Sequence, residues 1–197
     1  MIALFRLGAF MALLILCLAP PFEALAATGP GKSVEVEQPP DVTEQLTPQE
    51  IDLKPQTVAF LEDDGDWDDS ADMLNGAFKT IYASLAKAHI HATGAPLVEY
   101  VESDDTKFSF RAMVPIEKPT VTITLGSDVE IGEGPSGKAL KFVHRGSFDE
   151  LDQVYNRIDD YLSAKGLEMQ RVVEEYVTDQ TVTSPDSNIT SIYIFTE

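Results

Sequence analysis

The chain has 197 residues, of which 33 are acidic and 14 are lysine or arginine, and its formal net charge at pH 7 is −19. A hydrophobic fraction of 44% is ordinary for a globular protein, so we expect one domain with a normal core rather than a disordered acidic chain. The charge repels phosphates, and no basic helix or stripe offsets it, which excludes nucleic acid as a direct partner. The same charge favours neutral or cationic ligands, or serves solubility alone.

The first 26 residues have the pattern of a secretory signal. Arg6 precedes an apolar run from Leu7 to Ala19, and Ala24-Leu-Ala26 supplies small residues before a cleavage point. We predict a mature protein that is periplasmic or secreted and has no stable membrane insertion. An uncleaved anchor is the alternative, but the run is short for a bilayer that needs roughly 20 residues. Cleavage also removes Cys17, the only cysteine, so we expect no disulfide.

Residues 27–50 mix proline, glycine, threonine and acidic residues without a sustained period, which predicts a flexible linker. The folded domain is predicted over residues 51–197. It opens with a strand at 56–61 and an acidic turn at 62–69. The turn lacks the ligand spacing of an EF-hand, so it is better explained as the capped start of a helix than as a calcium site.

Two series of elements follow in the same order. The first begins with the strand at 56–61 and continues with a helix over about 70–88, a strand at 97–102 and a returning strand at 107–115. The second has a strand at 138–144, a helix from the capping box Ser147-Phe-Asp-Glu150 to Gly166, and strands at 168–177 and 189–195. The helical stripes align at one constant offset: Leu74, Phe78, Ile81 and Leu85 with Leu151, Tyr155, Ile158 and Leu162.

The strands repeat as well. Glu99-Tyr100-Val101 recurs as Glu175-Tyr176-Val177, and we align Phe108 and Phe110 with Tyr193 and Phe195. This duplication predicts an α+β fold in which two β-α-β-β units, at about 53–117 and 137–197, form an antiparallel sheet backed by two helices. A ligand pocket is expected between the halves, on the side of the sheet opposite the helices.

Glu174 is the leading candidate for function. Side chains alternate along a strand, so Glu174 shares a face with Tyr176, and the first copy has Val98 at the aligned position. A buried lone carboxylate is costly unless it is paired, hydrogen-bonded or protonated. The structural alternatives are that it meets Arg111 or Lys107 across the sheet, or points into solvent.

The chain resembles the GyrI-like small-molecule-binding domain, the effector-binding module of multidrug-responsive bacterial regulators. The resemblance is carried by Gly137-Lys-Ala-Leu-Lys-Phe-Val-His-Arg-Gly-Ser-Phe-Asp-Glu-Leu151, then by Tyr155, Tyr161-Leu162, Gly166 and Glu174-Glu-Tyr176. It covers about Leu53 to the C-terminus. The pattern departs at Asp179-Gln180 and at Ile194-Phe195, where the pocket rim is expected to differ. No helix-turn-helix segment is predicted, so we expect no direct binding to DNA.

The resemblance implies a pocket between the halves, lined by rings, in which Glu174 recognises lipophilic cations and Tyr176 forms a wall. Further ring candidates are Tyr100, Tyr193, Phe110 and Trp67. The family also includes hydrolases of small strained-ring compounds, in which a pocket glutamate is the general acid/base. A hydrolase using Glu174 is therefore one alternative, and an interaction protein without a ligand is another.

No cofactor or metal site is predicted. His89 and His91 lack a third ligand and suit the end of a helix. His144 could be catalytic or ligate haem, since haem-binding SOUL proteins have a related fold. A histidine hydrogen-bonded in the turn is the favoured interpretation.

Overall fold

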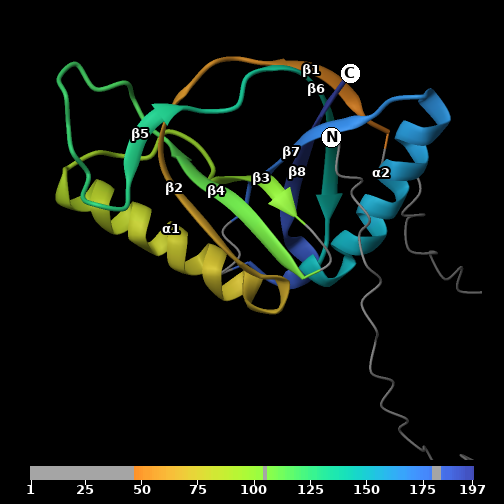
Figure 1. The fold of residues 1–197 in the computed structure, drawn as a ribbon, viewed down its shortest axis with the longest axis horizontal. Coiled ribbons are helices and arrows are strands. Elements are labelled where there is room, and N and C mark those ends of the chain that lie inside the picture. Colours follow the sequence, from red (N-terminus) through yellow and green to blue (C-terminus); the bar gives the residue numbers. More distant parts are fainter. Residues whose placement is uncertain (1–46, 104–105, 179–182) are drawn as a thin grey trace, which may run out of the picture.

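The computed structural model describes residues 47–103, 106–178 and 183–197 (Figure 1). The predicted signal, most of the predicted linker and the Asp179-Gln180 departure lie outside these residues. In the part of the chain that is described, no helix is long and apolar enough to cross a membrane.

Among the described residues, each half contributes four strands and one α-helix. The N-terminal half has β1 (Gln49–Leu53), β2 (Thr57–Asp66), α1 (Ser70–Lys87), β3 (Leu97–Ser103) and β4 (Lys107–Pro115). The C-terminal half has β5 (Glu130–Glu133), β6 (Gly137–Arg145), α2 (Leu151–Lys165), β7 (Met169–Tyr176) and β8 (Ile189–Thr196). Short 3-10 helices, η2 (Trp67–Asp69) and η3 (Phe148–Glu150), lead into α1 and α2, and η4 (Pro185–Ser187) precedes β8.

The strands form one antiparallel sheet in the order β1-β6-β8-β7-β3-β4-β2-β5. The predicted α+β class, with an antiparallel sheet backed by two helices, is confirmed. The helices lie at opposite ends of the sheet in Figure 1, with α1 in yellow and α2 in blue. Gly166 ends α2 in the left-handed conformation at φ 65°, which glycine adopts without steric cost.

Each half also has an edge strand that the sequence did not predict. β1 belongs to the N-terminal half but pairs with β6, and β5 belongs to the C-terminal half but pairs with β2. The repeating unit is therefore β-β-α-β-β, and the two units exchange their first strands. The residues assigned to the linker at Gln49 and Glu50 are part of β1, because they pair with Lys141 and Leu140.

The connection from β1 to β2 forces the sheet to bend. Residues 54–56 alone join two strands that are six places apart in the sheet. Three residues between strand ends reach about 14 Å, whereas six strand spacings in a flat sheet measure about 29 Å. The sheet must therefore curl, and the side chains of β1 and β2 meet in one apolar cluster on the concave side.

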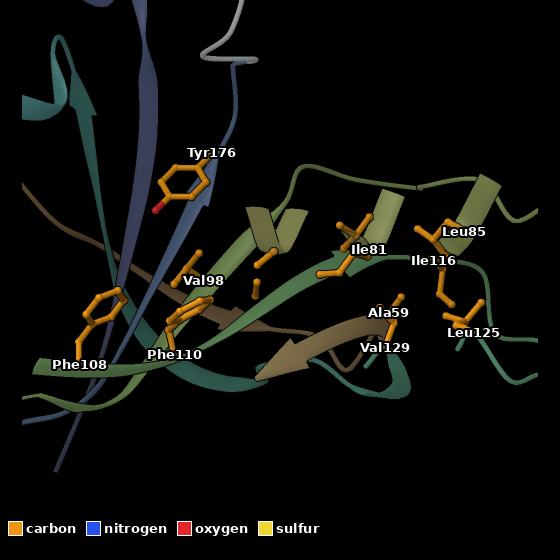
Figure 2. Close-up of a cluster of buried hydrophobic side chains, with 13 residues drawn as sticks. Ala59, Ile81, Leu85, Val98, Phe108, Phe110, Ile116, Leu125, Val129 and Tyr176 are labelled. Carbon is orange, nitrogen blue, oxygen red and sulfur yellow. The ribbon is translucent and has the colours of Figure 1, made fainter. Parts of the chain in front are cut away.

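The two faces of the sheet have separate cores. On the face that bears the helices, α1 buries Ala77, Ile81 and Leu85 against β2, β3 and β4 (Figure 2), while α2 buries Val154, Ile158 and Leu162 against β6, β7 and β8. The concave face is filled by Val58, Leu97, Met113, Ala139, Val173, Tyr193 and Phe195. The expectation that the side opposite the helices is left for a ligand is wrong, because this side is packed with apolar side chains.

The strand register also corrects one alignment. Val98 pairs with Ala112, and its counterpart Glu174 pairs with Ile192, so Ala112 and Ile192 are equivalent. Aligning Phe110 with Phe195 departs from this register by an odd number of residues, which moves every side chain to the other face. Phe108 and Phe110 lie under α1, whereas Tyr193 and Phe195 lie on the concave face.

Candidate ligand site around Glu174

Glu174 lies at the centre of the sheet, where the two halves meet. β3 and β7 are neighbours, and Glu174 pairs directly with Val98, the residue that the duplication aligns with it. A position that pairs with its own counterpart lies on the pseudo-two-fold axis that relates the halves. The axis therefore passes between an apolar residue and an acid.

The Glu174 carboxyl group is buried and receives hydrogen bonds from three phenols. Its side chain is 2% exposed. Tyr155, on α2, donates to Oε1 at 2.6 Å, and Tyr176 donates to Oε2 at 2.9 Å. Tyr100, on β3, donates to Oε2 at 3.3 Å. Three elements from both halves thus converge on one carboxyl group, and three of its roughly four lone-pair sites are occupied.

Burial raises the pKa of Glu174 above its ordinary value, because a dry site disfavours the charged form; hydrogen bonds from Tyr155, Tyr176 and Tyr100, and the charge of His144, oppose this in part. The pKa values of the three tyrosines are well above their ordinary value, first through burial and next through the nearby Glu174 charge. The phenols therefore remain protonated donors at neutral pH. The three donors favour a carboxylate, but burial outweighs them, so the charged form of Glu174 is less favoured here than in water.

Neither structural alternative for Glu174 is correct. The carboxyl group does not point into solvent, and Arg111 lies on the concave face, with its guanidinium 3.7 Å from the Phe60 ring centroid. The Lys107 ammonium is 3.4 Å from Asp66 Oδ1 at the sheet's end. Among the described residues, no lysine or arginine forms an ion pair with Glu174.

Aromatic rings surround this carboxyl group from both halves. Trp67 lies 5.8 Å from Tyr100, and Phe148, at the equivalent place in η3, lies 5.6 Å from Tyr176 (ring centroids). Phe78, on α1, packs edge-on against Tyr176 at 6.0 Å. Figure 2 shows Tyr176 near Val98, at the opposite end of the α1 core from Leu85 and Leu125.

The predicted site residues separate into two groups. Tyr100 and Tyr176 contact Glu174 directly, and Trp67 contacts Tyr100. Phe110 is opposite Tyr100 in the neighbouring strand but is 1% exposed and stacked on Phe108, as a core residue is. Tyr193 does not join the site.

Tyr193 lies on the concave face, where its hydroxyl group donates to Glu175 Oε2 at 2.5 Å. Its placement in the site followed from the alignment with the odd register. Tyr155 was missed as a site residue, although the sequence identifies it in the stripe of α2. Its position aligns with Phe78 of α1. The second copy thus has a phenol where the first has a phenyl group, and it has Glu174 where the first has Val98. These two paired differences are the signal that could have identified Tyr155 as a site residue.

His144 is explained by the turn after β6. Its Nε2 is 2.9 Å from Ser147 O, which confirms the predicted hydrogen-bonded turn histidine. Gly146 follows at φ 143°, a backbone conformation that residues with a Cβ rarely adopt, so this turn requires glycine. The turn leads into η3 and so positions Phe148. In the described part of the chain, no three His, Cys, Asp or Glu side chains gather as a metal site.

A duplicated sheet with two helices on one face, and a buried acid between rings at the junction, defines a class of two-module ligand-binding domain. The sequence matches the family described as GyrI-like small molecule binding domain over residues 46–195, and the chain belongs to that family. A search of curated protein sequences found no match.

Solved structures share the fold at low sequence identity. The C-terminal domain of EcmrR is 13% identical, with a TM-score of 0.64, and the match covers 77% of this chain and 98% of that one. A hydrolase from Listeria innocua is 16% identical, with a TM-score of 0.57 and coverage of 78% and 93%. SAV2435 bound to tetraphenylphosphonium is 14% identical, with a TM-score of 0.54 and coverage of 77% and 94%.

Proposed function

We propose that the protein binds a lipophilic cation between its two halves, with the Glu174 carboxylate as counter-charge and Tyr100, Tyr155, Tyr176 and Trp67 as surrounding groups. The observation that carries the proposal is the buried carboxyl group that has three phenol donors and, among the described residues, no ion pair with a lysine or arginine. A bound cation would supply the missing charge. Rings near a cation add about 0.5–2 kcal/mol each where water is excluded.

The family description and the ligand of SAV2435 support this proposal. Tetraphenylphosphonium is a lipophilic cation without hydrogen-bond donors, so it can be recognised only through charge and ring contacts. It is therefore the probe that isolates the contribution of Glu174.

The test is a titration of tetraphenylphosphonium into wild type, Glu174→Gln and Glu175→Gln. Glu175 is the matched control, because it is the neighbouring acid but lies on the concave face with Tyr193. Loss of the buried counter-charge is expected to weaken binding by at least about 30-fold in Glu174→Gln, since unpairing a buried charge costs about 2–5 kcal/mol. Glu175→Gln should bind within about two-fold of wild type. Equal affinities for all three proteins would contradict the proposal.

A second candidate is hydrolysis with Glu174 as the general acid/base. It is favoured by the raised pKa of this buried carboxyl group, because an acid near neutrality can take up and return a proton. Turnover of a strained-ring substrate that is lost in Glu174→Gln, while ligand binding is retained, would support this candidate. If wild type shows no turnover and Glu174→Gln loses ligand binding, the result supports a binding protein instead.

We also propose that the protein acts outside the cytoplasm, because residues 1–26 have the pattern of a cleaved signal. Mass spectrometry of the protein from the periplasm or medium should find a chain that begins at Ala27. A full-length chain in the membrane fraction would instead support the anchor.

A further inference from the structure

Asn188 is a buried polar residue that the proposed contacts do not use. It lies between η4 and β8, is 6% exposed, and its Oδ1 has no hydrogen-bond partner among the described residues. A buried amide oxygen loses its contacts with water, so leaving it unpaired destabilises the protein. A hydrogen-bond donor from outside the protein, such as a group of a bound ligand, would remove this cost.

Main-chain contacts place Asn188 beside the site. Gly146 N donates to Asn188 O at 3.0 Å, and Thr190, two residues further along, pairs directly with Tyr176. Asn188 directly precedes β8 and has an extended backbone, at φ −64° and ψ 143°, so the alternation of the strand continued by one residue places it on the helix-bearing face with Thr190 and Tyr176. Phe148, two residues after Gly146, packs against the Tyr176 ring.

The equivalent place in the N-terminal half is apolar. Asn188 precedes Ile192 by as many residues as Phe108 precedes Ala112, and Ile192 and Ala112 are equivalent by register. Phe108 is stacked on Trp67 with ring centroids 4.5 Å apart. The site is therefore flanked by stacked rings on one side of Glu174 and, on the other, by a ring with a buried, unpaired acceptor.

We propose that Asn188 Oδ1 accepts a hydrogen bond from a hydroxyl or N–H group of the bound cation. The site then selects cations that carry a donor at a distance from the charge over cations that are purely lipophilic. This inference rests on the proposed function, because it assigns one end of the same ligand. The Glu174 carboxylate sets the position of the ligand's charge, and Asn188 accepts a hydrogen bond from the other end of the ligand.

The test compares tetraphenylphosphonium with (3-hydroxyphenyl)triphenylphosphonium and (4-hydroxyphenyl)triphenylphosphonium. These probes share their charge and nearly their shape, and they differ in one donor. Wild type should prefer one hydroxylated isomer by about five-fold, the usual gain from one hydrogen bond to a buried acceptor. Asn188→Leu should remove the preference, and Asn188→Asp, which keeps the acceptor, should retain it. Asn156→Leu, at an exposed position of α2, is the control and should behave as wild type.

The quantity compared is the ratio of affinities within each variant, so a general loss of stability or an added charge cancels. A ratio that is the same in wild type and Asn188→Leu would overturn the assignment of Asn188 while leaving the cation site intact. Equal affinity of wild type for all three probes would overturn it as well. Failure of wild type to bind any of the probes would contradict the proposed function and, with it, this inference.

Discussion

The two halves of this protein share one architecture but differ at the positions that surround their common axis. Val98 in one half faces Glu174 in the other, and Phe78 on α1 corresponds to Tyr155 on α2. Tyr100 and Tyr176 are the same in both. The N-terminal copy thus keeps an apolar core around the axis, whereas the C-terminal copy provides an acid and one of its donors.

The site therefore depends on two coupled differences between the halves of an otherwise symmetric scaffold. An acid at the axis alone would be buried without enough partners, which costs several kcal/mol. The phenol of Tyr155 makes the shortest of the three hydrogen bonds to it, at 2.6 Å. The tyrosines that both copies share serve as donors only because one copy supplies a carboxyl group.

Exchanging the substitutions between halves should break and then restore the site. In Val98→Glu/Glu174→Val, Tyr100 and Tyr176 can still donate to the acid, but the charge has moved across the axis and faces Phe78, which cannot donate. Affinity for tetraphenylphosphonium should therefore fall by about 100-fold, more than after loss of the Tyr155 donor alone. Adding Phe78→Tyr and Tyr155→Phe moves the donor as well and should recover binding to within about ten-fold of wild type. Equally weak binding in the double and quadruple variants, both folded by circular dichroism, would contradict the coupling.

Removing only the Tyr155 donor should have a smaller effect. Tyr155→Phe leaves two phenols on Glu174 and raises the pKa of the carboxyl group further, because one interaction that favours the charged form is lost. Affinity for tetraphenylphosphonium should fall at least about ten-fold, as expected for one hydrogen bond to a charged group. The loss should be larger at lower pH, where more of the acid is protonated. A pH-independent loss would indicate a packing defect instead.

Tyr193→Phe should have the smallest effect on the site. Tyr193 is on the concave face and bonds Glu175, so cation affinity should stay within about two-fold of wild type, while stability falls by about 1 kcal/mol through the lost hydrogen bond. Chemical denaturation and the same titration measure both quantities. A large loss of affinity without a loss of stability would return Tyr193 to the site.

Periodicity and repetition were sufficient to predict the fold class, both helices, the duplication and the position of Glu174 beside Tyr176. They failed where the register between strands decides the outcome. The loop before β8 is longer than the loop before β4, so aligning aromatic residues by type placed Tyr193 on the wrong face. β1 and β5 were missed because they are short, acidic edge strands whose pairing lies in the other half.

The sequence also could not predict which face of the sheet carries the site. A strand pattern shows that Val172, Glu174 and Tyr176 share a face, but not which face the helices cover. The curl imposed by residues 54–56 fills the concave face, and this follows only from the exchange of edge strands. Tyr155 could be identified as buried, but its reach across to β7 required the packing of α2.

Glu174 is a buried acid that forms no ion pair with a lysine or arginine among the described residues, and we propose that the ligand supplies the positive charge. Its pKa is raised in the folded state, so the stability that comes with its protonated form is present below the ordinary pKa of a glutamate and is lost as pH rises through the folded value. A cation bound beside the carboxyl group would instead favour its charged form and lower its pKa. Carbon-13 NMR titration of the Glu174 carboxyl group, with Glu174→Gln for assignment, measures this pKa directly. We expect it to lie above that of an ordinary glutamate in the free protein and to fall when tetraphenylphosphonium binds; an ordinary value, or one that the cation leaves unchanged, would contradict the account.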